Sequence, residues 1–188
     1  MKNQNIISIV IISIFLLIPI TSIASVNQDS MTVTVTIDTI RSLEKEDKQF
    51  HFEKIIDANS DPDFYLKIWI GEEEFNSETF WNTKYLYDIN FQAVAQISES
   101  LTEIPIIIQL RDAADESITE DRLCDLNKDS GDLQASKEIS LVYDIQTGHW
   151  TGDDERGDPS GYGRLNGCDD ESYYTQELDC ELWFDITQ

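Results

Sequence analysis

The stretch Met31-Thr-Val-Thr-Val-Thr-Ile37 alternates apolar and hydroxyl-bearing residues with a period of two. Successive side chains of a β-strand point to opposite faces, so this alternation predicts a strand that buries one face. The stretches Phe64-Tyr-Leu-Lys-Ile-Trp-Ile70 and Ile104-Pro-Ile-Ile-Ile-Gln-Leu110 are mostly apolar, as is typical of central strands in a sandwich. These three stretches point to a β fold.

Similar strand patterns recur outward from these stretches, with no convincing long helix between them. The expected strands are Met31–Ile37, Gln49–Ile56, Phe64–Ile70, Phe75–Trp81, Ile89–Ile97, Ile104–Leu110, Glu138–Ile145 and Cys180–Ile186. A series of strands without alternating helices is typical of an antiparallel sandwich or barrel. We therefore predict an all-β, eight-stranded antiparallel sandwich with long acidic loops. Short helices near Leu123 or Leu133 stay open as an alternative for those loops.

The N-terminus has the pattern of a signal peptide. Lys2 precedes an apolar run over residues 6–20, and the small residues Ser22 and Ala24 follow at the spacing that signal peptidase prefers. Cleavage is expected after Ala24, which gives a protein that is secreted or held at the outer cell surface. The alternative is an uncleaved anchor, because the run approaches the length of a membrane span. Residues 25–30 are expected to be a flexible lead, and residues 31–188 a single domain.

The chain is strongly acidic, with 37 acidic and 13 basic residues and a net charge of −24. Removal of Lys2 with the signal peptide makes that charge one unit more negative. Such a charge excludes nucleic acid as a partner, because phosphates would be repelled. It argues against adhesion to anionic lipid and favours cations. The alternative is the solvated acidic surface of a halophilic protein, but here the acids are bunched in loops.

Three cysteines are present, Cys124, Cys168 and Cys180. An exported protein can form a disulfide, and the odd count leaves one thiol free or paired between chains. Cys168 with Cys180 is the favoured pair, although the connectivity does not follow from the sequence. A zinc site is not expected, because the two histidines, His51 and His149, lie far apart in the sequence.

The acidic residues form three groups in predicted loops. The first lies between the second and third strands, the second directly follows the sixth strand, and the third precedes the last strand. In an antiparallel sandwich the first two loops emerge at the same end, so the first two groups are expected to converge. The candidate metal ligands are Asp57, Asp61, Asp63, Asp112, Asp115, Asp121, Asp153, Asp154 and Asp158.

Converging carboxylates repel one another, by about 4 kcal/mol for a pair about 4 Å apart at an effective dielectric constant of 20. A divalent cation reverses the sign of this interaction. Calcium accepts 6–8 oxygen ligands at about 2.3–2.6 Å with irregular geometry, whereas magnesium demands a stricter octahedron. The sequence therefore favours Ca²⁺ as the ion, and the alternative for each single group is a solvated loop.

The first two acidic groups also carry a family resemblance. Ser60-Asp-Pro-Asp-Phe-Tyr-Leu-Lys-Ile68 resembles the Ser-Asp-Pro-Tyr-Val-Lys-Val segment that ends the first calcium loop of the C2 domain family. Leu110-Arg-Asp-Ala-Ala-Asp-Glu116 resembles the third calcium loop, except that its first two aspartates are three residues apart instead of two. Asp57 could match the family's first ligand, and either Asp61 or Asp63 the next.

The resemblance covers about residues 31–146. It implies an eight-stranded sandwich that binds calcium at one end, and it implies phospholipid binding as in many members of the family. The third acidic group, within Thr151–Gly163, resembles calcium loops in general but lacks EF-hand spacing, and Asp125–Gly131 comes nearer to that spacing. Both segments are candidates for a second calcium site, with plain solvated turns as the alternative.

An enzyme is not expected. The sequence has no Gly-x-Ser-x-Gly motif and no histidine near a candidate nucleophile, and about 164 mature residues leave little chain for the cleft of a glycosidase. The predicted function is a secreted calcium-binding module with a protein or glycan partner. One alternative is a carbohydrate-binding or adhesion module with structural calcium. Trp69, Trp81, Trp150 and Trp183 could stack on sugars, although Trp69 and Trp183 lie within strand patterns and are expected in the core.

The other alternative is calcium-dependent phospholipid binding. Two features of the sequence argue against it. The region around Phe64–Trp81 offers a single basic residue, Lys67, among several glutamates. The predicted loop tips lack an exposed Phe, Leu or Trp that would insert into a bilayer, with Ile118 as the one apolar residue at a tip.

Overall fold

A computed structural model describes residues 29–43, 61–114, 121–127, 137–154, 163–166 and 179–188. Within these ranges the chain forms strands, turns and bends, and no helix. The strands are β1 Ser30–Ser42, β2 Phe64–Ile70, β3 Glu73–Asn76, β4 Tyr85–Leu86, β5 Phe91–Ser98, β6 Glu103–Asp112, β7 Arg122–Leu123, β8 Ile139–Asp144, β9 His149–Gly152, β10 Arg164–Asn166 and β11 Cys180–Thr187.

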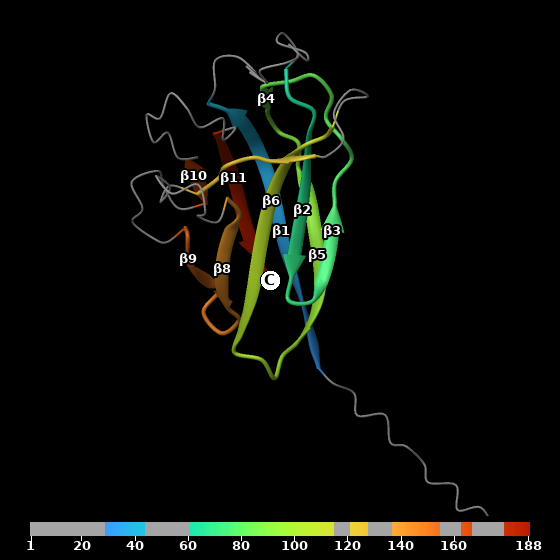
Figure 1. Ribbon diagram of the computed structural model, residues 1–188. Helices are drawn as coiled ribbons and strands as arrows, with labels where there is room; N and C mark the ends of the chain where they lie inside the picture. The colour runs from blue at the N-terminus through green and yellow to red at the C-terminus, as the bar shows by residue number, and fades with distance from the viewer. Residues whose placement is uncertain (1–28, 44–60, 115–120, 128–136, 155–162, 167–178) are drawn as a thin grey trace, which may run out of the picture.

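The strands form two sheets that pack face to face (Figure 1). The first sheet has the order β10-β11-β1-β4, and β5 also pairs with β1. The second has the order β3-β2-β6-β8-β9, and β7 pairs with the end of β6. Every pair of named strands is antiparallel. The predicted all-β antiparallel sandwich is therefore confirmed.

The core lies between the sheets because each long strand alternates inward apolar and outward polar residues. In β1, Val33, Val35 and Ile37 are fully buried, and the threonines between them face outward. An irregularity in the β1–β11 register between Ile37 and Thr39 shifts the alternation by one residue, so that Ile40 also points inward. In β2 and β6 the alternate isoleucines and leucines complete the same core.

The predicted strands match the structure best where they are long. The predicted strand 64–70 coincides with β2, and those at 31–37, 89–97, 104–110, 138–145 and 180–186 overlap β1, β5, β6, β8 and β11. The strand expected at 75–81 was wrong in extent, because β3 ends at Asn76. The strand expected at 49–56 lies outside the described residues. The prediction missed four short strands, β4, β7, β9 and β10. The helix considered near Leu123 is wrong, because Leu123 lies in β7. The helix considered near Leu133 lies outside the described ranges.

Two tryptophans depart from expectation. Trp69 and Trp183 are only partly buried and occupy the outer faces of β2 and β11, because their neighbours in the strands take the inward positions. Trp150 is buried, whereas Trp81 is 69% exposed. The expectation that Trp69 and Trp183 belong to the core was therefore wrong.

The N-terminal segment stays a prediction. Residues 1–24, and with them the signal peptide and its cleavage, lie outside the described residues, as does most of the lead at 25–30. In the part of the chain that the structure describes, no helix is long and apolar enough to cross a membrane.

Candidate functional site

The first two acidic groups meet at one end of the sandwich. The start of β2 pairs with the end of β6, with Phe64 opposite Asp112. The backbone N–H of Asp63 donates a hydrogen bond of 2.8 Å to Oδ1 of Asp112. In Figure 1 this end is at the top, where β2 starts and β6 finishes. We call it the acidic end, and its described carboxylates are those of Asp61, Asp63, Asp112 and Asp121.

Asp112 is the most buried carboxylate of the acidic end, with 7% of its surface exposed. Its Oδ2 accepts a hydrogen bond of 2.7 Å from the guanidinium of Arg122, which lies opposite it on β7. The carboxylate thus has a cationic partner from its own chain. A metal ion at Oδ2 would compete with that guanidinium.

Asp121 is held by two donors. Its Oδ1 accepts the backbone N–H of Ala114 at 2.8 Å, and its Oδ2 accepts the hydroxyl of Tyr65 at 2.7 Å. Because these bonds favour the ionised form, first Ala114 and then Tyr65 lower the pKa of Asp121. Desolvation and the bond to Asp121 raise the pKa of Tyr65. Asp121 is therefore a fixed anion beside the start of β2.

The loop between β3 and β4 is tied to the acidic end. The backbone N–H of Asn82 donates to Oδ1 of Asp63 at 2.6 Å, and the N–H of Asp61 donates to Oδ1 of Asn82 at 3.1 Å. Lys84 forms an ion pair of 3.4 Å with Asp61. Trp81, whose side chain is exposed, directly precedes Asn82. The expectation that no Trp is exposed at a loop tip was therefore wrong.

These carboxylates have the chemistry of a calcium site but do not form one by themselves. Among the residues that the structure describes, no group of three or more acidic, histidine or cysteine side chains is arranged to hold a metal ion. Asp57 and Asp115, which the sequence assigns to the same end, lie outside the described ranges. They would have to complete any coordination shell.

The third acidic group is built into the backbone framework. Oδ2 of Asp153 accepts the N–H of Ser140 at 2.7 Å. Asp154 is fully buried, and its Oδ2 accepts the indole N–H of Trp150 and the backbone N–H of Gly163, both at 2.8 Å. These bonds connect β8, β9 and β10. Asp158 lies outside the described residues, so its predicted role as a ligand stays a prediction.

The other candidates are only partly described. Asp125 is fully buried, and its Oδ1 accepts the N–H of Asn127 at 2.9 Å, while the rest of that loop lies outside the described residues. Cys124 and Cys180 are both buried. Cys168 also lies outside the described ranges, so the pairing of Cys168 with Cys180 stays a prediction.

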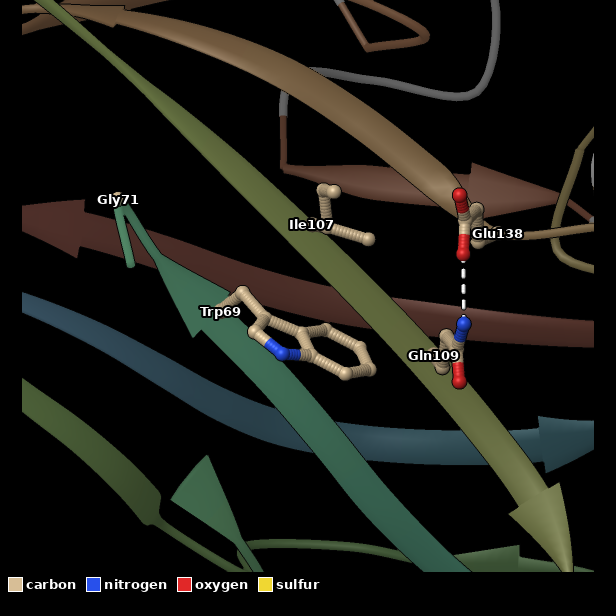
Figure 2. Close-up of a pocket in the computed structure, with 5 residues that line it drawn as sticks. All are labelled: Trp69, Gly71, Ile107, Gln109 and Glu138. Carbon is tan, nitrogen blue, oxygen red and sulfur yellow. Dashed lines mark hydrogen bonds between the residues drawn. The ribbon is translucent and has the colours of Figure 1, made fainter. Parts of the chain in front are cut away.

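The structure reveals a second locus that sequence reasoning missed. A pocket of about 230 Å³ lies on the outer face of the six-stranded sheet and is lined by Trp69, Gly71, Ile107, Gln109 and Glu138. Figure 2 shows the indole of Trp69 lying along the sheet toward Gln109, with Ile107 on the same neighbouring strand as Gln109, and Glu138 hydrogen-bonded to Gln109 beyond it. Its residues come from β2, from the turn that follows β2, from β6 and from the residue before β8, so that no single stretch of sequence signals it. We call it the Trp69 pocket.

Comparisons with known proteins give distant structural likenesses only. No family model matches the sequence, and no curated protein matches it. A calcium-bound structure of two C2 domains of extended synaptotagmin 2 is 13% identical, with a TM-score of 0.45, over 82% of this chain and 44% of that one. A structure described as a C2 domain is 9% identical, with a TM-score of 0.43, over 84% of this chain and 99% of the other.

A third likeness is to a much longer chain. Human GIVD cytosolic phospholipase A2, in complex with an inhibitor and terbium chloride, is 19% identical over 85% of this chain, with a TM-score of 0.40. This chain spans only 18% of that phospholipase. Likenesses this distant describe a similar arrangement of strands and say nothing about what this chain binds.

Proposed function

We propose that this protein is a secreted, non-enzymatic calcium-binding module whose acidic end holds the ion. The observation that supports the proposal is the hydrogen bond from Asp63 to Asp112, which places the two acidic segments side by side. Asp121 lies next to them through its bond to Tyr65. Carboxylates gathered in this way are stabilised by a hard divalent cation.

The proposed ligands are the carboxylates of Asp63, Asp112 and Asp121, together with Asp57 and Asp115. The last two lie outside the residues that the structure describes but are close to the others in the sequence. The ion would displace the guanidinium of Arg122 from Oδ2 of Asp112. We do not extend the proposal to Asp153 and Asp154, because their carboxylates already accept backbone and indole donors that hold three strands together.

Export suits such a site. A protein outside the cell meets steadily high calcium, so sites with dissociation constants of about 10⁻⁴–10⁻³ M are sufficient. Calcium would then be a constant structural partner. Mass spectrometry of the protein recovered from the medium is expected to show an N-terminus at Ser25, whereas a retained Met1 would contradict export by cleavage.

The acidic end is also the proposed site of a calcium-dependent partner, a protein or a glycan. Phospholipid is the second candidate, because exposed Trp81 offers an apolar side chain that could enter a bilayer beside the acidic residues. The net charge of −24 opposes attraction to anionic membranes at long range, although salt screens it beyond about 10 Å. We therefore expect weak calcium-dependent pelleting with anionic vesicles.

The decisive experiment is thermal unfolding with a chelator and with millimolar calcium. Calcium that binds only the folded state adds about 2.7 kcal/mol when its concentration is a hundred times the dissociation constant. We expect a higher Tm with calcium, and a much smaller rise in Asp63→Asn, which keeps an oxygen to accept the N–H of Asn82. Asp185→Asn, an equal change of charge on an exposed residue of β11, is the control. Coincident curves for the unmodified chain with and without calcium would refute the proposal.

A further inference from the structure

The Trp69 pocket lies on a different part of the molecule from the acidic end. β2 begins at the acidic end, and Gly71 directly follows its last residue. Trp69 lies five residues after Phe64 in β2, on the order of 16 Å along the strand, and Gln109 lies three residues before Asp112 in β6, on the order of 10 Å. Binding in the pocket can therefore be tested separately from calcium binding at the acidic end.

The walls of the pocket are mainly apolar, with one charge. The indole of Trp69 and the side chain of Ile107 face each other across neighbouring strands in register. Among the described residues that line the pocket, Glu138 alone is charged. Its Oε2 accepts the amide of Gln109 at 2.6 Å, and within the described residues no hydrogen bond to its Oε1 is found. The pocket thus offers an aromatic face, an aliphatic wall and a carboxylate oxygen.

Trp69 already accepts a cation from its own chain. The ammonium of Lys67 lies 5.0 Å from the centre of the indole ring, within the range of a cation–π interaction. Lys67 is in turn neutralised by Glu74, at 3.0 Å. Glu74 lies opposite Trp69 on β3, and Glu72, which is exposed, directly follows Gly71. The carboxylates of Glu72, Glu74 and Glu138 outnumber the ammonium of Lys67, so the local charge around the pocket favours a cation.

The same features disfavour the other ligand classes. A sugar needs several hydrogen-bonding groups around an aromatic platform, but the amide of Gln109 already donates to Glu138 and accepts from Arg111 at 2.9 Å. An anionic ligand would meet Glu138 in a chain of net charge −24. A cation on an aliphatic stem satisfies every wall, because the stem packs on Trp69 and Ile107 while its charge reaches Glu138.

We propose that the Trp69 pocket binds a lysine or arginine side chain of a basic partner protein. Arginine fits best, because its planar guanidinium presents several donors to the carboxylate of Glu138 while its stem packs on Trp69 and Ile107. The net charge of the chain would steer a basic partner toward it, and the pocket would fix where one side chain docks.

The test is a titration of the purified full chain, in chelator, with the blocked peptide acetyl-Gly-Arg-Gly-Arg-Gly-amide. Binding is followed by NMR through the indole N–H of Trp69 and the amides of Gly71 and Ile107. Glu138→Gln and Trp69→Leu are each expected to weaken binding by about threefold or more, the range of one exposed cation–π contact or ion pair. Thermal unfolding of each variant verifies that it is folded, and Glu138→Gln is close in shape to the original side chain.

Matched controls separate a pocket from diffuse charge attraction. Glu99→Gln makes the same change of charge at an exposed turn, and Tyr87→Leu removes an exposed aromatic residue elsewhere. Both are expected to leave the affinity for the peptide unchanged. Equal weakening in these controls would overturn the proposal, as would an unshifted Trp69 signal at saturating peptide. Stronger shifts at Trp69 with methyl glycosides or phosphatidylcholine vesicles than with the peptide would also overturn it.

Discussion

The backbone N–H of Asp63 lies 2.8 Å from Oδ1 of Asp112, although 49 residues separate the two in sequence. The other oxygen of Asp112 holds Arg122 on β7. One mostly buried carboxylate therefore joins the start of β2, the end of β6 and β7. The same group that is proposed to bind calcium also holds the backbone in place when calcium is absent.

Asp112→Ala should destabilise the protein in chelator. The substitution leaves the N–H of Asp63 and the guanidinium of Arg122 without their acceptor, at a cost of about 3 kcal/mol. Asp112→Asn keeps an oxygen for Asp63 and should cost about half as much. Urea unfolding in chelator measures both changes. A value for Asp112→Ala within the error of the unmodified chain would contradict the structural role of this carboxylate.

Tyr65→Phe should destabilise the protein in a way that depends on pH. The folded pKa of Asp121 is lowered from 3.8, in part by the hydroxyl of Tyr65. A lowered pKa stabilises the fold at pH values above 3.8, and this stabilisation is lost as the pH falls through the folded value. The difference between the variant and the unmodified chain should therefore be largest near neutral pH and shrink in acid. Tyr87→Phe is the control, and a difference that grows toward low pH would contradict the assignment.

Gly152→Ala should be far more harmful than Gly71→Ala. A Cβ at Gly152 would lie 2.3 Å from the carbonyl oxygen of Ser140, at a φ of +122°. At Gly71 the φ is +61° and nothing lies within 4 Å, so the expected cost is about 1 kcal/mol from the left-handed conformation alone. Thermal unfolding of the two variants makes the comparison. Equal Tm values would show that the β8–β9 pair can shift to admit a methyl group.

Glu181→Gln should lower the free energy of unfolding by about 2 kcal/mol. This is less than the usual cost of breaking a buried ion pair, because the two arginines that pair with Glu181 are partly exposed. Glu181 is 2% exposed and forms ion pairs with Arg41 and with Arg164, the latter at 2.5 Å. The guanidinium of Arg164 also lies 4.5 Å from the centre of the Trp183 ring. Glu99→Gln, which changes the same charge at an exposed turn, should alter stability by less than about 0.5 kcal/mol. Urea unfolding measures both variants, and similar losses in the two would count against a specific role for Glu181.

The sequence predicts the long strands because their alternation extends over enough residues to be recognised. The residues of β2 show it most clearly, since Phe64, Leu66, Ile68 and Ile70 all face inward. Strands of two to four residues, such as β4, β7, β9 and β10, carry no such pattern and exist because a longer neighbour pairs with them. Trp69 shows how prediction can fail within a strand. It lies between two isoleucines, so its apolar character suggests the core, but alternation along the strand turns its side chain outward.

The candidate site shows a different limit. A carboxylate in a loop is a calcium ligand by chemistry, but its partner decides its role. Asp154 is occupied by Trp150 and Gly163, and Asp112 is shared with Arg122. The Trp69 pocket could not be predicted because Trp69 on β2 and Glu138, just before β8, are brought together by β6, which lies between those two strands.

The central strand of the first sheet, β1, has consequences for how the protein is made. It is the first of the described strands to be synthesised, yet one of its two long partners is β11, with Thr34 opposite Thr187. Contacts between residues so distant in sequence form slowly, because a large loop must close before they stabilise anything. A nascent chain thus cannot complete this sheet until β11 has left the ribosome. A premature stop codon ahead of Cys180 would leave one long edge of β1 unpaired and open to other chains.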